Sequence, residues 1–95
     1  MTGSTRSSAG LDERRRRLLF RSWHRGSREM DLILGRFADA HIGDLSAPEL
    51  DEYERLLNTP DPQFYDWLSG VSAAPTEVDT ALFRRLRKFS VGPGR

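Results

Sequence analysis

The segment from Met30 to His41 constrains the fold more than any other part of the chain. Its stripe residues recur at positions i, i+3, i+4 and i+7 along the segment. They are Met30, Ile33, Leu34, Phe37, Ala38 and His41. This spacing places them on one face of an amphipathic helix. The pattern therefore predicts a helix that packs one face against a core.

Two further helices are predicted on either side of this segment. Leucines and a tryptophan at helical spacing predict a first helix from Leu11 to about Trp23, with arginines on the opposite face. A third helix should start near Ala47, because Ser46 and Glu49 have the spacing of a capping box. The sequence Asn58-Thr59-Pro60 should end it, since proline lacks the backbone donor that a helix needs.

Two shorter helices are predicted in the C-terminal half. Asp61 as N-cap and Pro62 as first helical residue indicate a helix that ends at Gly70. Its Phe64 and Trp67 are expected in the core and its Tyr65 on the surface. A last helix is expected to start around Thr76 to Asp79, with an apolar stripe. The stripe residues are Val78, Leu82, Leu86 and Phe89.

No segment alternates apolar and polar residues with the β-branched enrichment of a strand. Five helices with short connections predict an all-α protein, a small compact five-helix bundle. The predicted domain spans residues 11–90. Residues 1–10, rich in Ser and Thr, are expected to form a disordered N-terminal tail, and residues 91–95 a C-terminal tail.

Composition narrows the class of protein. Fifteen basic and fourteen acidic residues leave a net charge of +1, which is not the strong positive field of a typical nucleic-acid binder. Cysteine is absent, so disulfides and thiolate chemistry are excluded. No apolar run is long enough for a membrane span or a secretory signal, so we expect a soluble, cytoplasmic protein without membrane insertion.

Residues for catalysis or for binding a metal or cofactor are not grouped in any known motif. His24 and His41 do not have zinc-ligand spacing. We expect His41 to interact with the last carbonyls of its helix. Serines lie in the tail or at helix starts, where capping explains them, and no phosphate-binding glycine motif is present. We therefore predict no enzyme activity, no metal site and no stably held cofactor.

The run from Arg14 to Arg17 has two interpretations. It is either the solvated face of a helix or a surface that contacts phosphates on nucleic acid or an anionic membrane. No second basic element with interleaved aromatic residues accompanies it. Binding of nucleic acid or an anionic surface is thus kept as the alternative function.

The segment His24-Arg25-Gly26-Ser27-Arg28-Glu29-Met30-Asp31 also has two compatible interpretations. In the structural one, Gly26 takes a positive φ between two helices, and Glu29 and Asp31 complement the dipole of the second helix. In the functional one, Arg25 and Arg28 are presented at an exposed corner, where they can donate to carboxylates or carbonyls of a partner.

This segment resembles the SdhE family of small assembly factors, whose hallmark is RGxxE. The motif stands here as Arg25-Gly26-Ser27-Arg28-Glu29, and further matching positions follow it. They are Asp31, Phe37, Leu45-Ser46, Tyr53, Leu56-Leu57, Asp61-Pro62, Tyr65, Trp67 and Leu68. RGxxE alone is a weak signal, but its combination with the downstream Asp-Pro and Trp-Leu pairs is specific. The resemblance covers about Leu18 to Leu86, and it does not include the Arg-rich lead-in or the C-terminal tail.

The resemblance implies a compact helical bundle and a chaperone function. Such a protein would bind the flavoprotein subunit of succinate dehydrogenase and promote covalent attachment of FAD, with a fumarate reductase flavoprotein as a second candidate client. The docking surface would comprise Arg25, Gly26, Arg28, Glu29 and Asp31. The chemistry would belong to the partner and its FAD, because docking holds the flavoprotein where its own histidine can bond to the flavin. We expect the free chain to be a monomer.

Overall fold

A computed structural model describes residues 10–90, and this part of the chain is helical without any strand. The elements are α1 (Glu13–Trp23), α2 (Arg28–His41), the short 3-10 helix η1 (Ile42–Asp44), α3 (Ala47–Leu57), α4 (Asp61–Ser69) and α5 (Ala81–Ser90). The prediction of an all-α, five-helix fold is confirmed. The predicted tails, apart from Gly10, lie outside the described residues.

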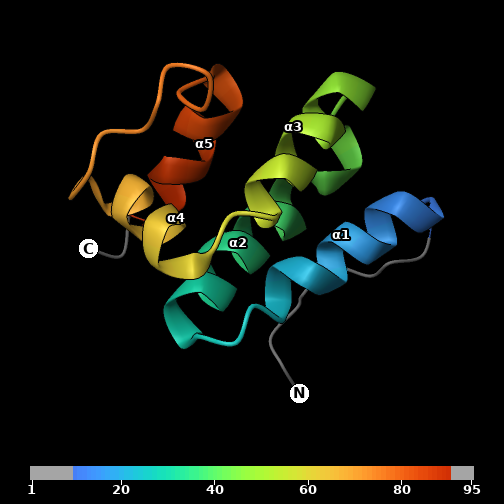
Figure 1. Cartoon of the computed structure of the whole chain (residues 1–95). Helices are drawn as coiled ribbons and strands as arrows, with labels where there is room; N and C mark the ends of the chain where they lie inside the picture. Colours follow the sequence, from blue (N-terminus) through green and yellow to red (C-terminus); the bar gives the residue numbers. More distant parts are fainter. Residues whose placement is uncertain (1–9, 91–95) are drawn as a thin grey trace.

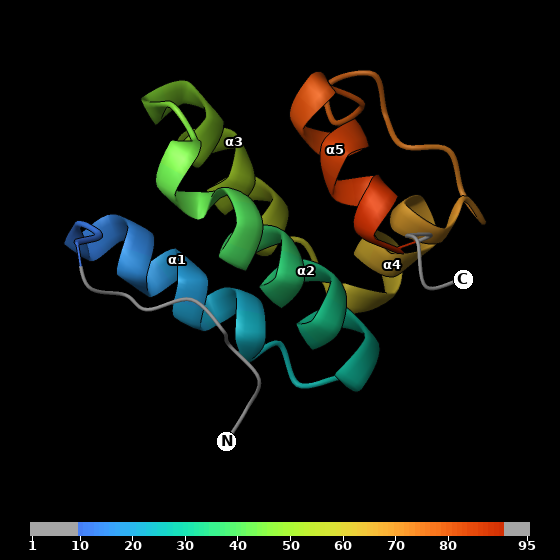
Figure 2. The ribbon, with the colours of Figure 1, turned by 180° about the vertical axis from the view of Figure 1, so that it is seen from behind.

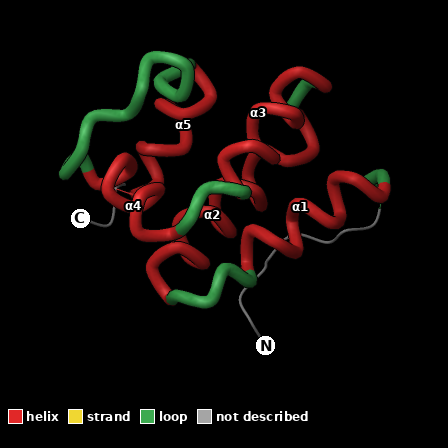
Figure 3. The backbone as a smooth tube through the Cα atoms, viewed as in Figure 1, coloured by secondary structure: helices red, strands yellow, loops and turns green. Residues whose placement is uncertain are grey.

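The helices form one small assembly with α2 at its centre. In both opposite views α1 lies on one side of α2, while α4 and α5 lie together on the other side (Figures 1 and 2). α2 packs on both α1 and α5, and α3 packs on α1. The longest connection joins α4 to α5, as the loop segments in Figure 3 show. The Cα radius of gyration is 12.5 Å, which is that of a compact domain of this length.

Local capping chemistry explains where α1 and α3 start. The Asp12 carboxylate accepts a bond from the Arg15 backbone N–H at 2.9 Å, so α1 begins at Glu13 rather than at Leu11. The predicted capping box is present at α3, with the Ser46 hydroxyl accepting from the Glu49 N–H and the Glu49 carboxylate accepting from the Ser46 N–H. Each cap supplies acceptors for N–H groups that a helix start leaves unpaired.

The predicted starts of α4 and α5 were wrong. Pro60 is the N-cap of α4, and Asp61 is already helical. α5 begins at Ala81, where the Thr80 hydroxyl accepts from the Phe83 N–H at 3.2 Å. The expected earlier start fails because the Pro75 carbonyl accepts from the N–H groups of both Val78 and Asp79, which closes a turn instead of a helix.

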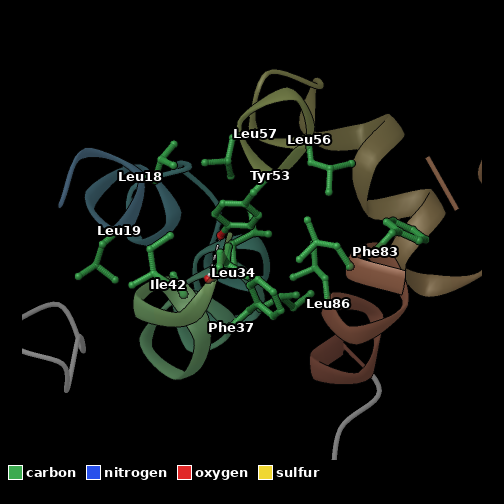
Figure 4. Close-up of a cluster of buried hydrophobic side chains, with 14 of the residues drawn as sticks. Leu18, Leu19, Leu34, Phe37, Ile42, Tyr53, Leu56, Leu57, Phe83 and Leu86 are labelled. Carbon is green, nitrogen blue, oxygen red and sulfur yellow. Dashed lines mark hydrogen bonds between the residues drawn. The ribbon is translucent and has the colours of Figure 1, made fainter. Parts of the chain in front are cut away.

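The core lies between the helices and is built from the predicted stripes. Tyr53 lies at its centre, surrounded by leucine, isoleucine and phenylalanine side chains from α1, α2, η1, α3 and α5 (Figure 4). Its hydroxyl lies 2.6 Å from the Ser22 hydroxyl, which in turn donates to the Leu18 carbonyl at 2.7 Å. These bonds satisfy the buried polar groups. Burial raises the pKa of the Tyr53 phenol well above its usual range.

The predictions for the three aromatic residues of α4 are confirmed, and the prediction for His41 of α2 is not. Phe64 and Trp67 are buried, whereas Tyr65 is 40 % exposed. The His41 ring packs against the rings of Phe37 and Phe89, at centroid distances of 5.0 and 5.9 Å, and makes no hydrogen bond to a helix carbonyl among the described residues. Aromatic packing at the start of η1 therefore takes the place of the expected cap.

α1 and α2 approach closely because Gly35 has no side chain. A Cβ atom built on Gly35 would lie 2.2 Å from Cδ2 of the Trp23 indole. The indole Nε1 donates to Asp39 at 3.1 Å, one turn further along α2. Trp23 thus packs directly on the backbone of α2.

No helix within residues 10–90 is long and apolar enough to cross a membrane.

Candidate functional site

The connection between α1 and α2 carries the RGxxE residues and has a defined shape. α1 ends at Trp23, and Gly26 has a φ of 104°, a conformation that favours glycine. The Ser27 hydroxyl then accepts from the Met30 N–H at 3.3 Å as the N-cap of α2. A Cβ on Gly26 would meet no atom within 4 Å. The predicted positive φ is confirmed, and in the free chain the need for glycine is conformational rather than steric.

Asp31, in the first turn of α2, stabilises this connection. Its carboxylate accepts from the Arg25 backbone N–H at 2.6 Å. Glu29 and Asp31 both lie in the first turn of α2, as predicted, where negative charge is favoured by the helix dipole. Asp31 thus acts inside the chain, because it fixes the backbone on the far side of Gly26.

Arg25 does not lie at an exposed corner, and that expectation was wrong. Its side chain is only 10 % exposed and points into the junction between α3 and α4. The guanidinium donates to the carbonyl of Leu57, to the carbonyl of Thr59 at 2.8 Å, and to the carboxylate of Asp61 from Nε at 2.9 Å and from Nη2 at 2.5 Å. It also lies 5.8 Å from the centre of the Phe64 ring.

The bonds of Arg25 explain why it turns inward. The last carbonyls of a helix have no partner within the helix, and here α3 ends beside the side chain of Arg25. A guanidinium offers five donors in a flat fork, which suits two carbonyls and a carboxylate at once. Arg25 therefore caps α3, pairs with the start of α4 and holds the α1–α2 connection against both.

Arg28 and Glu29 are the motif side chains that face solvent. Both residues are exposed, and neither side chain makes a hydrogen bond or ion pair with any other residue of the 10–90 range. They follow the N-cap of α2 directly, so their backbone is helical and firmly placed. One cation and one anion are thus held on a rigid turn, free to form charge-assisted hydrogen bonds with a partner.

The structure separates the predicted site residues into two sets. Arg25 and Asp31 hold the connection in shape through bonds within the chain, whereas Gly26, Arg28 and Glu29 are exposed on it. Sequence reasoning missed Asp61 as the partner of Arg25, because it assigned Asp61 as the N-cap of α4. It also missed Phe20, which is 63 % exposed. Phe20 lies two residues from Leu18 and therefore off the apolar stripe of α1, and this position could have indicated that its ring is exposed.

The run from Arg14 to Arg17 does not form one cationic surface. Arg14 pairs with Asp51 at 2.7 Å and with Glu54 at 2.9 Å, both on α3. Arg15 donates to the carbonyls of Ile42 and Leu45. All four arginines thus form bonds within the chain, since Arg16 donates to the Leu11 carbonyl and Arg17 pairs with Glu13. Within residues 10–90, no group of three or more His, Cys, Asp or Glu side chains is arranged to hold a metal ion.

Comparisons with known proteins place this arrangement in context. A family model described as flavinator of succinate dehydrogenase matches residues 16–90. The FAD assembly factor SdhE of Acetobacter pasteurianus is 41% identical over 88 residues, which cover 87% of this chain and 81% of that protein. No solved structure gives a significant match.

Mitochondrial relatives are also similar. Succinate dehydrogenase assembly factor 2-A of Drosophila yakuba is 38% identical over 85 residues, covering 87% of this chain and 52% of that protein. Succinate dehydrogenase assembly factor 2 of Dictyostelium discoideum is 35% identical over 74 residues, covering 78% and 52%. This chain therefore spans about half the length of these two relatives.

Proposed function

The chain belongs to the family of flavinators of succinate dehydrogenase, and we propose that it is an assembly factor that promotes covalent attachment of FAD to the flavoprotein subunit of that enzyme. The observation that carries the proposal is the family match over residues 16–90, which includes the whole α1–α2 connection. The names of relatives from bacteria and mitochondria support the same function.

The proposed mechanism uses docking rather than catalysis by this chain. Arg28 and Glu29 bind the flavoprotein, and Gly26 leaves the surface beside them open. Arg25 and Asp31 act as positioning residues, because their bonds fix the backbone that presents the pair. Docking stabilises a flavoprotein conformation in which its own histidine can bond to FAD. The flavin supplies the redox-active ring and stays with the partner.

The alternative of a nucleic-acid or anionic-surface module is less well supported. It relied on four arginines acting together, and Arg14 and Arg15 are occupied by acceptors of this chain. A protein that neutralises only two phosphates gains little affinity at physiological salt. The predicted cytoplasmic location, the monomeric state of the free chain and a fumarate reductase client stay predictions.

Reconstitution of flavinylation tests the proposal. The purified flavoprotein subunit of the same organism is incubated with FAD, with and without this chain, and covalent flavin is measured by in-gel fluorescence. We expect the signal to depend on this chain and to fall in the Glu29→Ala and Arg28→Ala variants. Arg36→Ala is the matched control, since Arg36 is an exposed arginine of α2 without a polar partner in residues 10–90. Equal flavinylation with and without the chain would overturn the proposal.

A further inference from the structure

The outer face of α1 carries an aromatic pair beside the motif connection. The Phe20 and His24 rings are stacked, with centroids 3.9 Å apart and planes inclined by 16°. His24 Nδ1 also lies 2.7 Å from the Phe20 carbonyl oxygen. The His24 imidazole is thus held by both the ring and the backbone carbonyl of Phe20. This pair is preorganised, so little side-chain freedom remains to be lost on binding.

The aromatic pair is continuous with the motif connection. One open depression on α1 is lined by Glu13, Arg16, Arg17, Phe20 and Arg21. A second is lined by Phe20, Arg21, His24, Arg25 and Asp61. Because Phe20 and Arg21 belong to both, a single surface runs along α1 to the residues that hold the motif. The α1 helix itself lies at the edge of the molecule (Figure 1).

The rim of this surface is positively charged. Glu13 is paired with Arg17 at 3.3 Å. Arg16 donates to the Leu11 carbonyl at 2.6 Å and Arg21 to the Asn58 side-chain oxygen at 2.9 Å, and both acceptors are neutral. Neither arginine forms an ion pair with an acidic side chain among residues 10–90. Two arginines that form no ion pair with the described residues therefore border the aromatic pair.

A single exposed apolar residue is ordinary on a protein surface. Phe20 differs because it is preorganised by His24, bordered by arginines and adjacent to the proposed binding turn. Aromatic and arginine side chains are enriched among the residues that dominate binding energy at protein interfaces. The rest of the exposed face of α1 offers only charged groups, so Phe20 is its one large apolar anchor.

We propose that this face of α1 is a second docking element for the flavoprotein subunit, formed by Phe20, His24, Arg16 and Arg21. It receives an apolar side chain of the partner that is bordered by carboxylates. The inference rests on the proposed function, and it names the partner chemistry at a surface outside RGxxE. The positive rim calls for an acidic partner surface. A strand of nucleic acid fits less well, because one stacking ring and two arginines do not make a groove that follows a phosphate backbone.

The test compares dissociation constants, measured by calorimetry, between the full chain and the purified flavoprotein subunit. We expect Phe20→Ser to weaken binding by about tenfold or more, as for an interface anchor, and Phe20→Tyr, which keeps the ring, to stay within about twofold. Val71→Ser is the matched control, since Val71 is an apolar residue that is 76 % exposed away from this surface. Circular dichroism and urea unfolding check that each variant is folded.

The outcomes separate this inference from the proposed function. If the unchanged chain does not bind the flavoprotein, both the proposed function and this inference are refuted. If it binds, and Glu29→Ala weakens binding while Phe20→Ser does not, the second docking element alone is refuted. The same proteins are run in sedimentation velocity and with a single-stranded oligonucleotide. A Phe20-dependent self-association or oligonucleotide complex, with flavoprotein affinity unchanged in Phe20→Ser, would assign the surface to another occupant and overturn the inference.

Discussion

The guanidinium of Arg25 and the carboxylate of Asp61 meet at 2.5 Å, although 36 residues separate them in the sequence. Their side chains are 10 % and 28 % exposed. The same guanidinium donates to the carbonyls of Leu57, at the end of α3, and of Thr59. This one side chain therefore ties the α1–α2 connection to both ends of the α3–α4 connection, and the shape of the motif depends on a residue far outside it.

Arg25→Ala should destabilise the fold. It leaves the Leu57 and Thr59 carbonyls without their donor and Asp61 without its cation, and removing one partner of a largely buried pair costs about 3 kcal/mol. Arg25→Lys should cost less, about 1–2 kcal/mol, because it keeps the charge but loses the fork. Urea unfolding measures both. Arg28→Ala is the control and should stay within about 0.5 kcal/mol. Equal stability of Arg25→Ala and Arg28→Ala would contradict the internal role of Arg25.

The helices and the turn at Gly26 were predictable, because they depend on local signals. Apolar spacing placed α1, α2 and α3, and the capping box placed the start of α3 to the residue. The start of α5 was missed because an isolated turn and the first turn of a helix use the same residue types, and only the contacts of Val78 and Thr80 distinguish them.

The candidate site was less predictable than the fold. Its residues could be located from the motif, but not the direction of each side chain. Arg25 and Arg28 look alike in sequence, and one is mostly buried while the other is exposed. The difference depends on where α3 ends in space, since its last carbonyls attract the nearer guanidinium. Contacts at a separation of 36 residues leave no periodic signal.

Gly35→Ala should be strongly destabilising despite the better helix propensity of alanine. The new Cβ would lie 2.2 Å from the Trp23 indole, so the indole or α1 must shift away from α2. Overpacking of this kind costs about 1–3 kcal/mol or more, against a propensity gain of about 1 kcal/mol. Urea unfolding gives the net change.

The control for this variant is Gly70→Ala, where the added Cβ meets nothing and only the positive φ of 87° is strained. It should cost about 1 kcal/mol. In a double-mutant cycle, Gly35→Ala and Trp23→Leu should be coupled by about 1 kcal/mol or more, because they share the contact. Additive effects would show that the clash is relieved elsewhere.

His41 should make the stability pH-dependent on the acid side. Burial, followed by the positive charge of Arg85, lowers the pKa of His41 below its ordinary value of 6.5, while Asp44 opposes this. The unfolded chain therefore takes up a proton on His41 before the folded chain does. The free energy of unfolding should be at its full value above the ordinary pKa and should fall as the pH drops below about 6.5. We expect a loss below about 1 kcal/mol, since His41 is only partly buried.

Urea midpoints at pH 8 and pH 5.2 measure this loss. The His41→Gln variant should lose most of the difference between the two pH values, whereas the His24→Gln variant should keep it. This pH range lies above the titration of the carboxylates Asp12 and Asp79, whose pKa values are lowered from 3.8. The chief cause is the Arg15 backbone N–H for Asp12 and the Arg84 side chain for Asp79. A His41→Gln protein with an unchanged pH dependence would rule out His41 as the source.

The arginine run should separate into structural and solvated members. Arg15 donates to the Ile42 carbonyl at 2.9 Å and the Leu45 carbonyl at 2.5 Å, so it holds α1 to η1. Arg15→Ala should cost about 2 kcal/mol, because it leaves two partly buried carbonyls without donors. Arg17 is 61 % exposed and, among residues 10–90, pairs only with Glu13, so Arg17→Ala should cost no more than about 0.5 kcal/mol. If the run were instead a nucleic-acid surface, substituting either arginine would leave the free energy of unfolding unchanged and would weaken nucleic-acid binding equally. Urea unfolding and an electrophoretic shift assay at two salt concentrations, run on both variants, decide between the two interpretations.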